Sequence, residues 1–153
     1  MMTNKEAAAA IRKQLKNVGI NGVSVRSDEY AIRCTIKNAE VNRRDVEKIA
    51  RSFEVVDRDE VTGEVLLGGN VFVFVDYAYG LIEEAAAVYE DEARGILEDM
   101  EGHECMSIGD GLFLADLNGL EVRQSGVGGR LIRSARDLAV ALYKFRAFGN
   151  IAA

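Results

Sequence analysis

The sequence predicts an α+β protein made of two small units, in which helices pack on antiparallel sheets. Segments with helical periodicity alternate with segments whose apolar residues recur at every second position. Their order is α-β-β-α-β-β and then α-β-β-β-α, and no linker rich in Pro, Ser or charge separates the two sets. With 153 residues, 48% of them apolar, the chain can form a hydrophobic core. We therefore expect an N-terminal unit at 1–79 and a C-terminal unit at 80–153, sharing one body.

The first unit opens with an expected helix and two expected strands. Thr3-Asn4-Lys5-Glu6 has the pattern of a capping box, and the helix that follows is expected to stop at Gly19. Residues 22–27 and 30–37 alternate apolar and polar side chains, which predicts two strands joined by a tight turn. In this alternation Tyr30 falls on the core side.

A second helix and a hairpin complete the first unit. Asn42 is the expected N-cap of a helix over 43–53. Residues 64–67 and 71–75 flank a Gly-Gly-Asn loop, which predicts an antiparallel hairpin. Because every residue of 71–75 is apolar, we expect this strand to be covered on both faces.

The second unit begins with the longest expected helix, residues 81–100, which carries one apolar stripe and a bend or close contact at Gly95. Three strands are expected at 103–108, 112–116 and 119–124, with Asn-Gly in the last turn as the strongest hairpin signal in the chain.

A glycine-rich loop and a final helix end the chain. Gly126-Val127-Gly128-Gly129 precedes a helix that Ser134 is expected to cap. The loop lacks both the dinucleotide fingerprint and the Lys-Ser/Thr of a triphosphate loop, so we interpret it as a turn. A nucleotide site at this loop with Arg130 is the alternative.

The charge is strongly segregated along the sequence. Residues 1–53 hold 11 basic and 6 acidic side chains, residues 54–104 hold 2 and 15, and residues 105–153 hold 6 and 4. The net charge of the chain is −6. Such asymmetry is typical of a surface that faces a partner, although the acidic middle could also fold against the basic ends.

The acidic helix gives the sharpest functional hypothesis. Glu84, Asp91 and Glu98 are seven residues apart, which places their carboxylates about 10.5 Å from one another along one face of a straight helix. Such a row can imitate nucleic-acid phosphates and occupy a basic groove. An ordinary solvated helix face is the simpler alternative. The expected partner-binding residues are Glu83, Glu84, Glu90, Asp91, Glu98 and Glu101, with Tyr79 and Leu81 as anchors.

The first unit carries the opposite charge and gives the alternative hypothesis, nucleic-acid binding. Six basic residues are the candidates: Arg12, Lys13, Lys16, Arg26, Arg33 and Lys37. A nucleic-acid surface usually adds exposed aromatic side chains for stacking, and Tyr30 is the nearest one.

Residues 7–55 resemble a small α+β domain of the large polyvalent proteins of bacteriophages and mobile elements. The matching pieces are the IRKQLK segment at 11–16, the VSVRS strand at 23–27, and Val46, Ile49 and Phe53 on the second helix. The family has no established catalytic residues to transfer. The resemblance implies a phage or plasmid setting, in which small acidic proteins often inhibit host defence, and in size and charge the chain looks like an anti-CRISPR protein.

We therefore expect a non-catalytic inhibitor in the cytoplasm of a host bacterium, with no cofactor, no metal and no membrane contact. Its expected partner is a host protein or ribonucleoprotein with a basic groove, a CRISPR effector above all. With one histidine and no Ser-His-Asp or Cys-His-Asp constellation visible in the sequence, we do not expect a nucleophilic triad. His103 with Cys105 is interpreted as a strand start with a buried thiol. A nucleic-acid-binding accessory domain, a nucleotide enzyme and a homodimer remain open alternatives.

Overall fold

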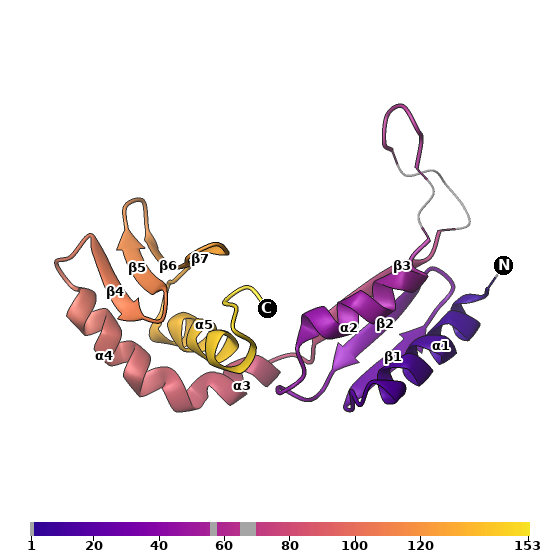
Figure 1. Ribbon diagram of the computed structural model, residues 1–153, viewed down its shortest axis with the longest axis horizontal. Helices are drawn as coiled ribbons and strands as arrows, with labels where there is room; N and C mark the ends of the chain where they lie inside the picture. Colours follow the sequence, from indigo (N-terminus) through magenta and orange to yellow (C-terminus); the bar gives the residue numbers. More distant parts are fainter. Residues whose placement is uncertain (1, 56–57, 65–69) are drawn as a thin grey trace. The chain divides into compact units, whose positions relative to one another are not determined.

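The computed structural model describes residues 2–55, 58–64 and 70–153. The chain divides into two compact units, Met1–Tyr79 and Gly80–Ala153. Each unit combines helices with one sheet, so the predicted α+β fold class is confirmed (Figure 1).

The first unit follows the predicted order of helices and strands. Its elements are α1 (Asn4–Asn17), β1 (Val23–Ser27), β2 (Ala31–Ile36), α2 (Arg43–Ala50) with the 3₁₀ turn η1 (Arg51–Phe53), and β3 (Phe72–Tyr77). Both predicted caps are present. The Glu6 N–H donates to the Thr3 hydroxyl at 3.2 Å while the Thr3 N–H donates to the Glu6 carboxylate at 2.8 Å, and Asn42 accepts from the Arg44 N–H at 3.0 Å.

The sheet of the first unit is mixed, with strand order β1-β2-β3. β1 pairs antiparallel with β2, but β3 pairs parallel with β2, so the expected antiparallel sheet is wrong for this strand. The physical reason is the intervening helix α2, because a crossover helix returns the chain in the same direction. The expected hairpin partner of β3 falls largely on 65–69, outside the described residues; Val55 and Val71 form an antiparallel bridge beside it.

Both helices of this unit pack on the same face of its sheet, as Figure 1 shows. The core between them contains Ala7, Ala8, Ile11 and Leu15 of α1, Val46 and Ala50 of α2, and Val25, Ile32, Cys34, Ile36, Val73 and Val75 of the strands. Among the described residues of this unit, no helix packs on the opposite face. The expectation that 71–75 is covered on both sides is therefore wrong, and Phe74 is 45% exposed.

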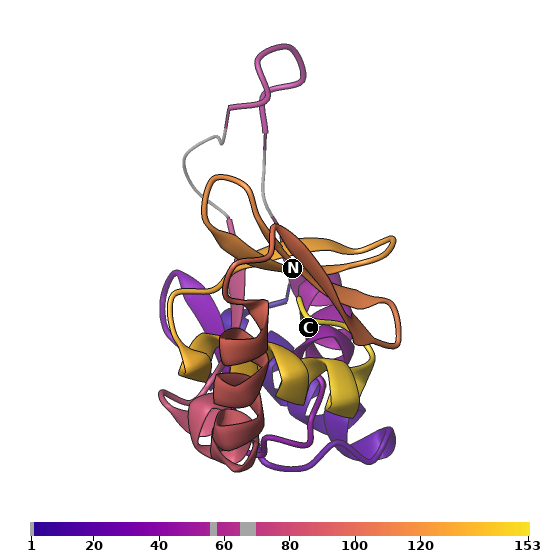
Figure 2. The ribbon, with the colours of Figure 1, turned by 90° about the vertical axis from the view of Figure 1, so that its left-hand side faces the viewer.

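The second unit contains one more strand than predicted. Its elements are α3 (Leu81–Ala86), the 3₁₀ turn η2 (Ala87–Tyr89), α4 (Glu90–Met100), β4 (Cys105–Gly109), β5 (Leu112–Asp116), β6 (Leu120–Gln124), β7 (Gly128–Leu131) and α5 (Ala135–Phe148). The strands form an antiparallel sheet in sequence order, and the helices lie on one side of it (Figure 2). Leu112, Leu114, Val122 and Leu138 are fully or nearly fully buried.

The predicted helix over 81–100 is interrupted at η2 and not at Gly95, which remains inside α4. All three segments pack on α5, so the interruption does not separate either half of the predicted helix from it. Tyr89 of η2 lies against α5, with its ring centroid 6.5 Å from that of Tyr143 and 4.7 Å from the Arg146 guanidinium. Both halves of the predicted helix therefore pack on α5.

A tyrosine hydroxyl connects β3 to the start of α2 and gives a first testable prediction. The Tyr77 hydroxyl donates to the Val41 carbonyl at 2.7 Å and accepts from the Arg43 N–H at 3.0 Å, in a partly buried position. Tyr77→Phe should lower the free energy of unfolding by about 1–2 kcal/mol, because both backbone groups lose their partner. Urea unfolding of the full chain measures this loss.

Tyr79→Phe is the matched control. The Tyr79 side chain is fully exposed, so its variant should stay within about 0.5 kcal/mol of the parent chain. Equal effects of the two substitutions would contradict a structural role for the Tyr77 hydroxyl.

Candidate nucleic-acid interface

The helix-free face of the first sheet carries a defined set of side chains. Because side chains alternate between faces, the residues next to the buried Val25, Cys34 and Val75 point away from α1 and α2. They are Ser24 and Arg26 on β1, Arg33 and Thr35 on β2 with the buried Ala31 at its start, and Phe72, Phe74 and Asp76 on β3. We call this set the open face.

One row across the open face consists of two arginines and a phenylalanine. The register pairs Arg26 with Arg33 and Arg33 with Phe74, so the three residues lie side by side on the three strands. The Arg33 guanidinium lies 5.1 Å from the centroid of the Phe74 ring, a cation–π contact. Like charges directly opposite each other destabilise a sheet, so the pairing of Arg26 with Arg33 is by itself unfavourable for folding.

The acid nearest to this row neutralises it only in part. The Asp28 carboxylate lies 3.7 Å from the Arg33 Nε. The same carboxylate accepts the N–H groups of Tyr30 and Ala31, and these hydrogen bonds lower the pKa of Asp28 more than Arg33 does. Among the described residues, Arg26 forms no ion pair.

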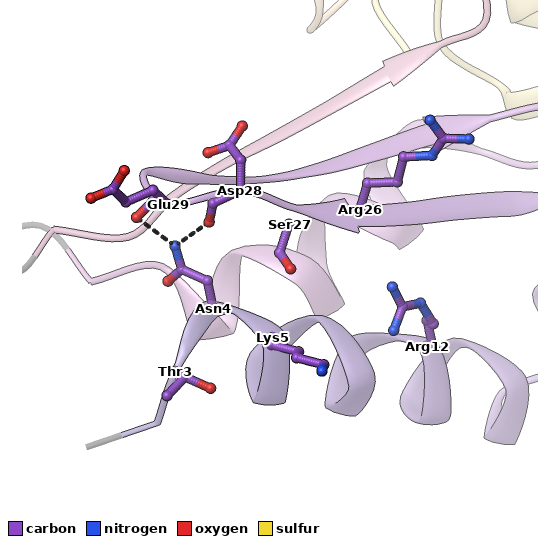
Figure 3. A pocket seen from close by; sticks show the side chains of 8 residues that line it. All are labelled: Thr3, Asn4, Lys5, Arg12, Arg26, Ser27, Asp28 and Glu29. Atoms are coloured by element: carbon purple, nitrogen blue, oxygen red, sulfur yellow. Dashed lines mark hydrogen bonds between the residues drawn. The ribbon is translucent and has the colours of Figure 1, made fainter.

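A groove adjoins this row where α1 passes the free edge of β1 (Figure 3). It has a volume of about 810 Å³, and Lys5, Arg12 and Arg26 are its basic lining residues. The Arg12 guanidinium donates to the Val25 carbonyl, with Nε at 3.2 Å, and so covers one outward-facing group of the edge strand. At the other end the Asn4 amide donates to the carbonyls of Asp28 and Glu29, which fixes the β1–β2 turn to α1.

The other predicted basic residues surround these two features. Lys16 follows Arg12 by four residues and shares its flank of α1, Lys13 is turned about 100° away from Arg12, and Lys37 is exposed directly after β2. Five of the six predicted basic residues thus belong to α1, β1 or β2, and Lys37 directly follows β2.

The aromatic residues on this part of the unit differ from the sequence prediction. Tyr30 was expected on the core side, but it is 70% exposed, because the chain is still in the Asp28 turn at that point and has not yet entered β2. Phe74 was assigned to the core as part of an all-apolar run. Only the one-sided packing of the helices reveals it as a surface residue, and no signal within 71–75 distinguishes it from its buried neighbours.

The acidic residues are divided between the two units. Residues 1–79 contain 12 basic and 12 acidic side chains, while residues 80–153 contain 7 and 13. Six of the 15 acids of the 54–104 segment belong to the first unit and nine to the second. The segment therefore does not belong to one folded unit.

Within the second unit, η2 separates the predicted partner-binding residues into two groups. Glu83 and Glu84 are exposed on α3, whereas Glu90, Asp91, Glu98 and Glu101 lie on α4 or at its end; Tyr79 is fully exposed and Leu81 half-buried. The expected straight row with a 10.5 Å repeat does not form, because the helix turns between residues 84 and 91 (Figure 1).

Arginines of the second unit pair with three carboxylates of α4. Arg94 lies 2.7 Å from Asp91 and 3.9 Å from Glu90, and Arg146 forms two hydrogen bonds of 2.6 and 2.7 Å with Glu92. Several acids also occupy the first turns of α3 and α4, where negative charge stabilises a helix. These carboxylates have a structural explanation.

The carboxylates at the other end of α4 do not have such an explanation. Glu98, Asp99 and Glu101 are exposed at or near its C-terminus, where the helix dipole disfavours negative charge, and no basic residue lies in its last turn. None of the three forms an ion pair within the described part of the chain. They are the part of the predicted acidic surface that folding does not account for.

Two of the remaining motifs, Cys105 and the glycine-rich segment at 126–128, line one pocket of the second unit with a volume of about 580 Å³. Gly126 and Gly128 have φ values of 77° and 128° and belong to the β6–β7 hairpin, so the glycine-rich segment is not a loop that leads into a helix. Cys105 was expected to be buried but is exposed, because it lies on the edge strand β4. The other thiol, Cys34, is in the core, where burial raises its pKa to about 11. No group of three or more His, Cys, Asp or Glu side chains suited to a metal exists among the described residues.

Comparisons of this chain with known protein families, with curated proteins and with solved structures found no match. The resemblance of residues 7–55 to the polyvalent-protein domain therefore stays a prediction. In the described part of the chain, no helix combines the length and the apolar composition needed to cross a bilayer.

The Glu92–Arg146 pair gives a pH-dependent prediction. The hydrogen bonds from Arg146 lower the pKa of Glu92 below its ordinary value of 4.5. The pair therefore stabilises the second unit above pH 4.5, and this contribution is lost as the pH falls through the lower pKa of the folded state. Because both side chains are more than one-third exposed, Glu92→Gln should cost at most about 1 kcal/mol at pH 7.

Hydrogen exchange of α4 and α5 at pH 7 and pH 3 measures this difference. Glu98→Gln is the control: it removes a charge that the helix dipole disfavours, so stability at pH 7 should stay equal or rise slightly. A loss for Glu92→Gln that is as large at pH 3 as at pH 7 would contradict the ion-pair origin.

Proposed function

We propose that this protein acts by binding and that its N-terminal unit binds single-stranded nucleic acid across the open face. The observation that carries the proposal is the row Arg26, Arg33 and Phe74. Two arginines face each other at a cost to the sheet, next to an exposed aromatic ring. Phosphates can neutralise the arginines while a base stacks on the ring, so nucleic acid is the ligand that both parts of the row match.

The stacking requirement favours a single strand over a duplex. A base can lie on Phe74 only if its face is not already covered by the next base pair. Phe72 lies two residues before Phe74 on the same face of β3, about 6.6 Å away along the strand, and is half-buried. Two neighbouring rings on one strand fit successive unstacked bases and do not fit the outside of a duplex.

A direct test is fluorescence anisotropy with labelled ten-thymidine single strands and a duplex of equal length, at low and moderate salt. The single strand should bind more tightly than the duplex. Phe74→Ala should weaken single-strand binding about tenfold through lost stacking. Arg33→Gln should weaken it and should also reduce the slope of log affinity against log salt by about 0.7, since one phosphate contact is lost.

Tyr79→Ala serves as the control, because this aromatic residue is fully exposed outside the three strands. It should leave the affinity unchanged. Absence of binding by the parent chain at low salt, or equal losses for Tyr79→Ala and Phe74→Ala, would remove the proposal.

The second candidate function is inhibition of a host defence complex, an anti-CRISPR role, through the acidic end of α4. The observation that favours it is the exposed set Glu98, Asp99 and Glu101 at a helix end where folding disfavours negative charge. Carboxylates at this helix end match a basic groove on a partner. There they would exclude nucleic acid, and their binding would be sensitive to salt. The phage or mobile-element setting implied by residues 7–55 is part of this second proposal.

Its test is pull-down and nuclease inhibition with a purified CRISPR effector ribonucleoprotein. Reversing Glu98, Asp99 and Glu101 to Lys should abolish capture, while reversing Glu83 and Glu84 at the start of α3 should weaken it less. Unchanged capture by the α4 variant, or no capture by the parent chain, would rule out this role for the α4 end.

A further inference from the structure

We infer that the groove between α1 and the edge of β1 holds the phosphodiester backbone of the same single strand after it leaves the open face. This inference rests on the proposed function and adds a second subsite to it. The strand would cross the row from Phe74 over Arg33 to Arg26, turn around the edge of β1, and continue along α1 past Arg12 and Lys5.

The position of Arg26 supports this path. It is the last member of the row on the open face, and it also lines the groove, so it belongs to both surfaces. Figure 3 shows Arg26 extending away from α1 on one side of β1, while on the other side Arg12 points from α1 toward the strand and Lys5 lies along the helix. A nucleic-acid backbone that contacts Arg26 can therefore extend over the open face and into the groove while it stays next to basic side chains.

The spacing along α1 suits a repeating anion. Lys5 and Arg12 are seven residues apart, so they share a flank of the helix and are separated by about 10.5 Å along its axis. Lys5 is exposed and, within the described residues, has no ion pair. Arg12 uses its Nε and one terminal nitrogen on the Val25 carbonyl, which leaves the other terminal nitrogen for a phosphate oxygen.

The acidic residues beside the groove limit how far the nucleic-acid strand can extend along it. Asp28 and Glu29 line it near Asn4, and the Asn4 amide binds their carbonyls, which keeps the turn in place. An anion is therefore attracted to the Lys5–Arg12 stretch and repelled from the β1–β2 turn. This asymmetry indicates a strand that runs along α1 and does not cover the turn.

Strand length separates the two subsites experimentally. A four-thymidine strand is long enough for the open face alone, whereas a ten-thymidine strand also reaches the groove. Lys5→Glu should weaken the ten-thymidine strand about fivefold at low salt and lower its salt slope by about 0.7, and it should leave the four-thymidine strand unchanged. Lys13→Glu, on the same helix but outside the groove, is the matched control and should have a much smaller effect.

The outcomes distinguish this inference from the proposed function. If both strands bind, Phe74→Ala weakens both, and Lys5→Glu affects neither or both equally, the groove inference is wrong while the open-face proposal stands. If Lys13→Glu matches Lys5→Glu, the effect is general electrostatics and the groove is again excluded. Polyglutamate that competes with the ten-thymidine strand at equal charge, and loses this ability with Lys5→Glu, would assign the groove to an acidic protein segment and overturn the inference.

Discussion

In each unit the helices cover one face of a sheet, and this one-sided packing is the constraint on which the other properties of the molecule depend. In the first unit, Ile11, Ile32 and Ile36 are completely buried between sheet and helices. Each contributes about 1.5–3 kcal/mol through removal of its side chain from water. Because these contacts already stabilise the sheet, the side chains on the opposite face are not needed to form the core. Residues on that face whose arrangement is unfavourable for folding therefore indicate a binding function.

The same reasoning separates the charged groups that folding explains from those that it does not. Glu92 is held by Arg146, Asp91 by Arg94, and the acids of the first turns are stabilised by the helix dipole. Arg26 and the acids at the end of α4 have no ion pair among the described residues, and Asp28 neutralises the neighbouring Arg33 only in part. The open face has the stronger case of the two, because its arginines lie beside an aromatic ring whose chemistry matches the same ligand.

Local signals in the sequence predicted the helices and most strands, because caps and periodicity act within a few residues. Thr3, Asn42 and Ser134 each cap the helix they were expected to cap. The wrong predictions concern features that depend on contacts between residues far apart in the sequence. β3 is parallel because α2 intervenes, and Phe74 is exposed because both helices lie on the other face. The strand β7 was missed because its first two residues are glycines, which have low strand propensity. The candidate row could not be predicted, since it requires the register of three strands.

The net charge of a sequence segment also does not determine the local charge around a bound ligand. The first unit has equal numbers of acidic and basic side chains, and the whole chain has a net charge of −6. Electrostatic interactions between exposed groups extend over a Debye length of about 8–10 Å at physiological salt. Within such a distance, a ligand on the open face meets Arg26 and Arg33 together with two acids, Asp28 and Asp76. Asp45 and Glu47 belong to α2 on the other face of the sheet. Binding of an anion by a chain with an acidic average is therefore consistent with its electrostatics where the anion contacts the Arg26–Arg33 row and the Lys5–Arg12 stretch and lies away from Asp28, Glu29 and Asp76.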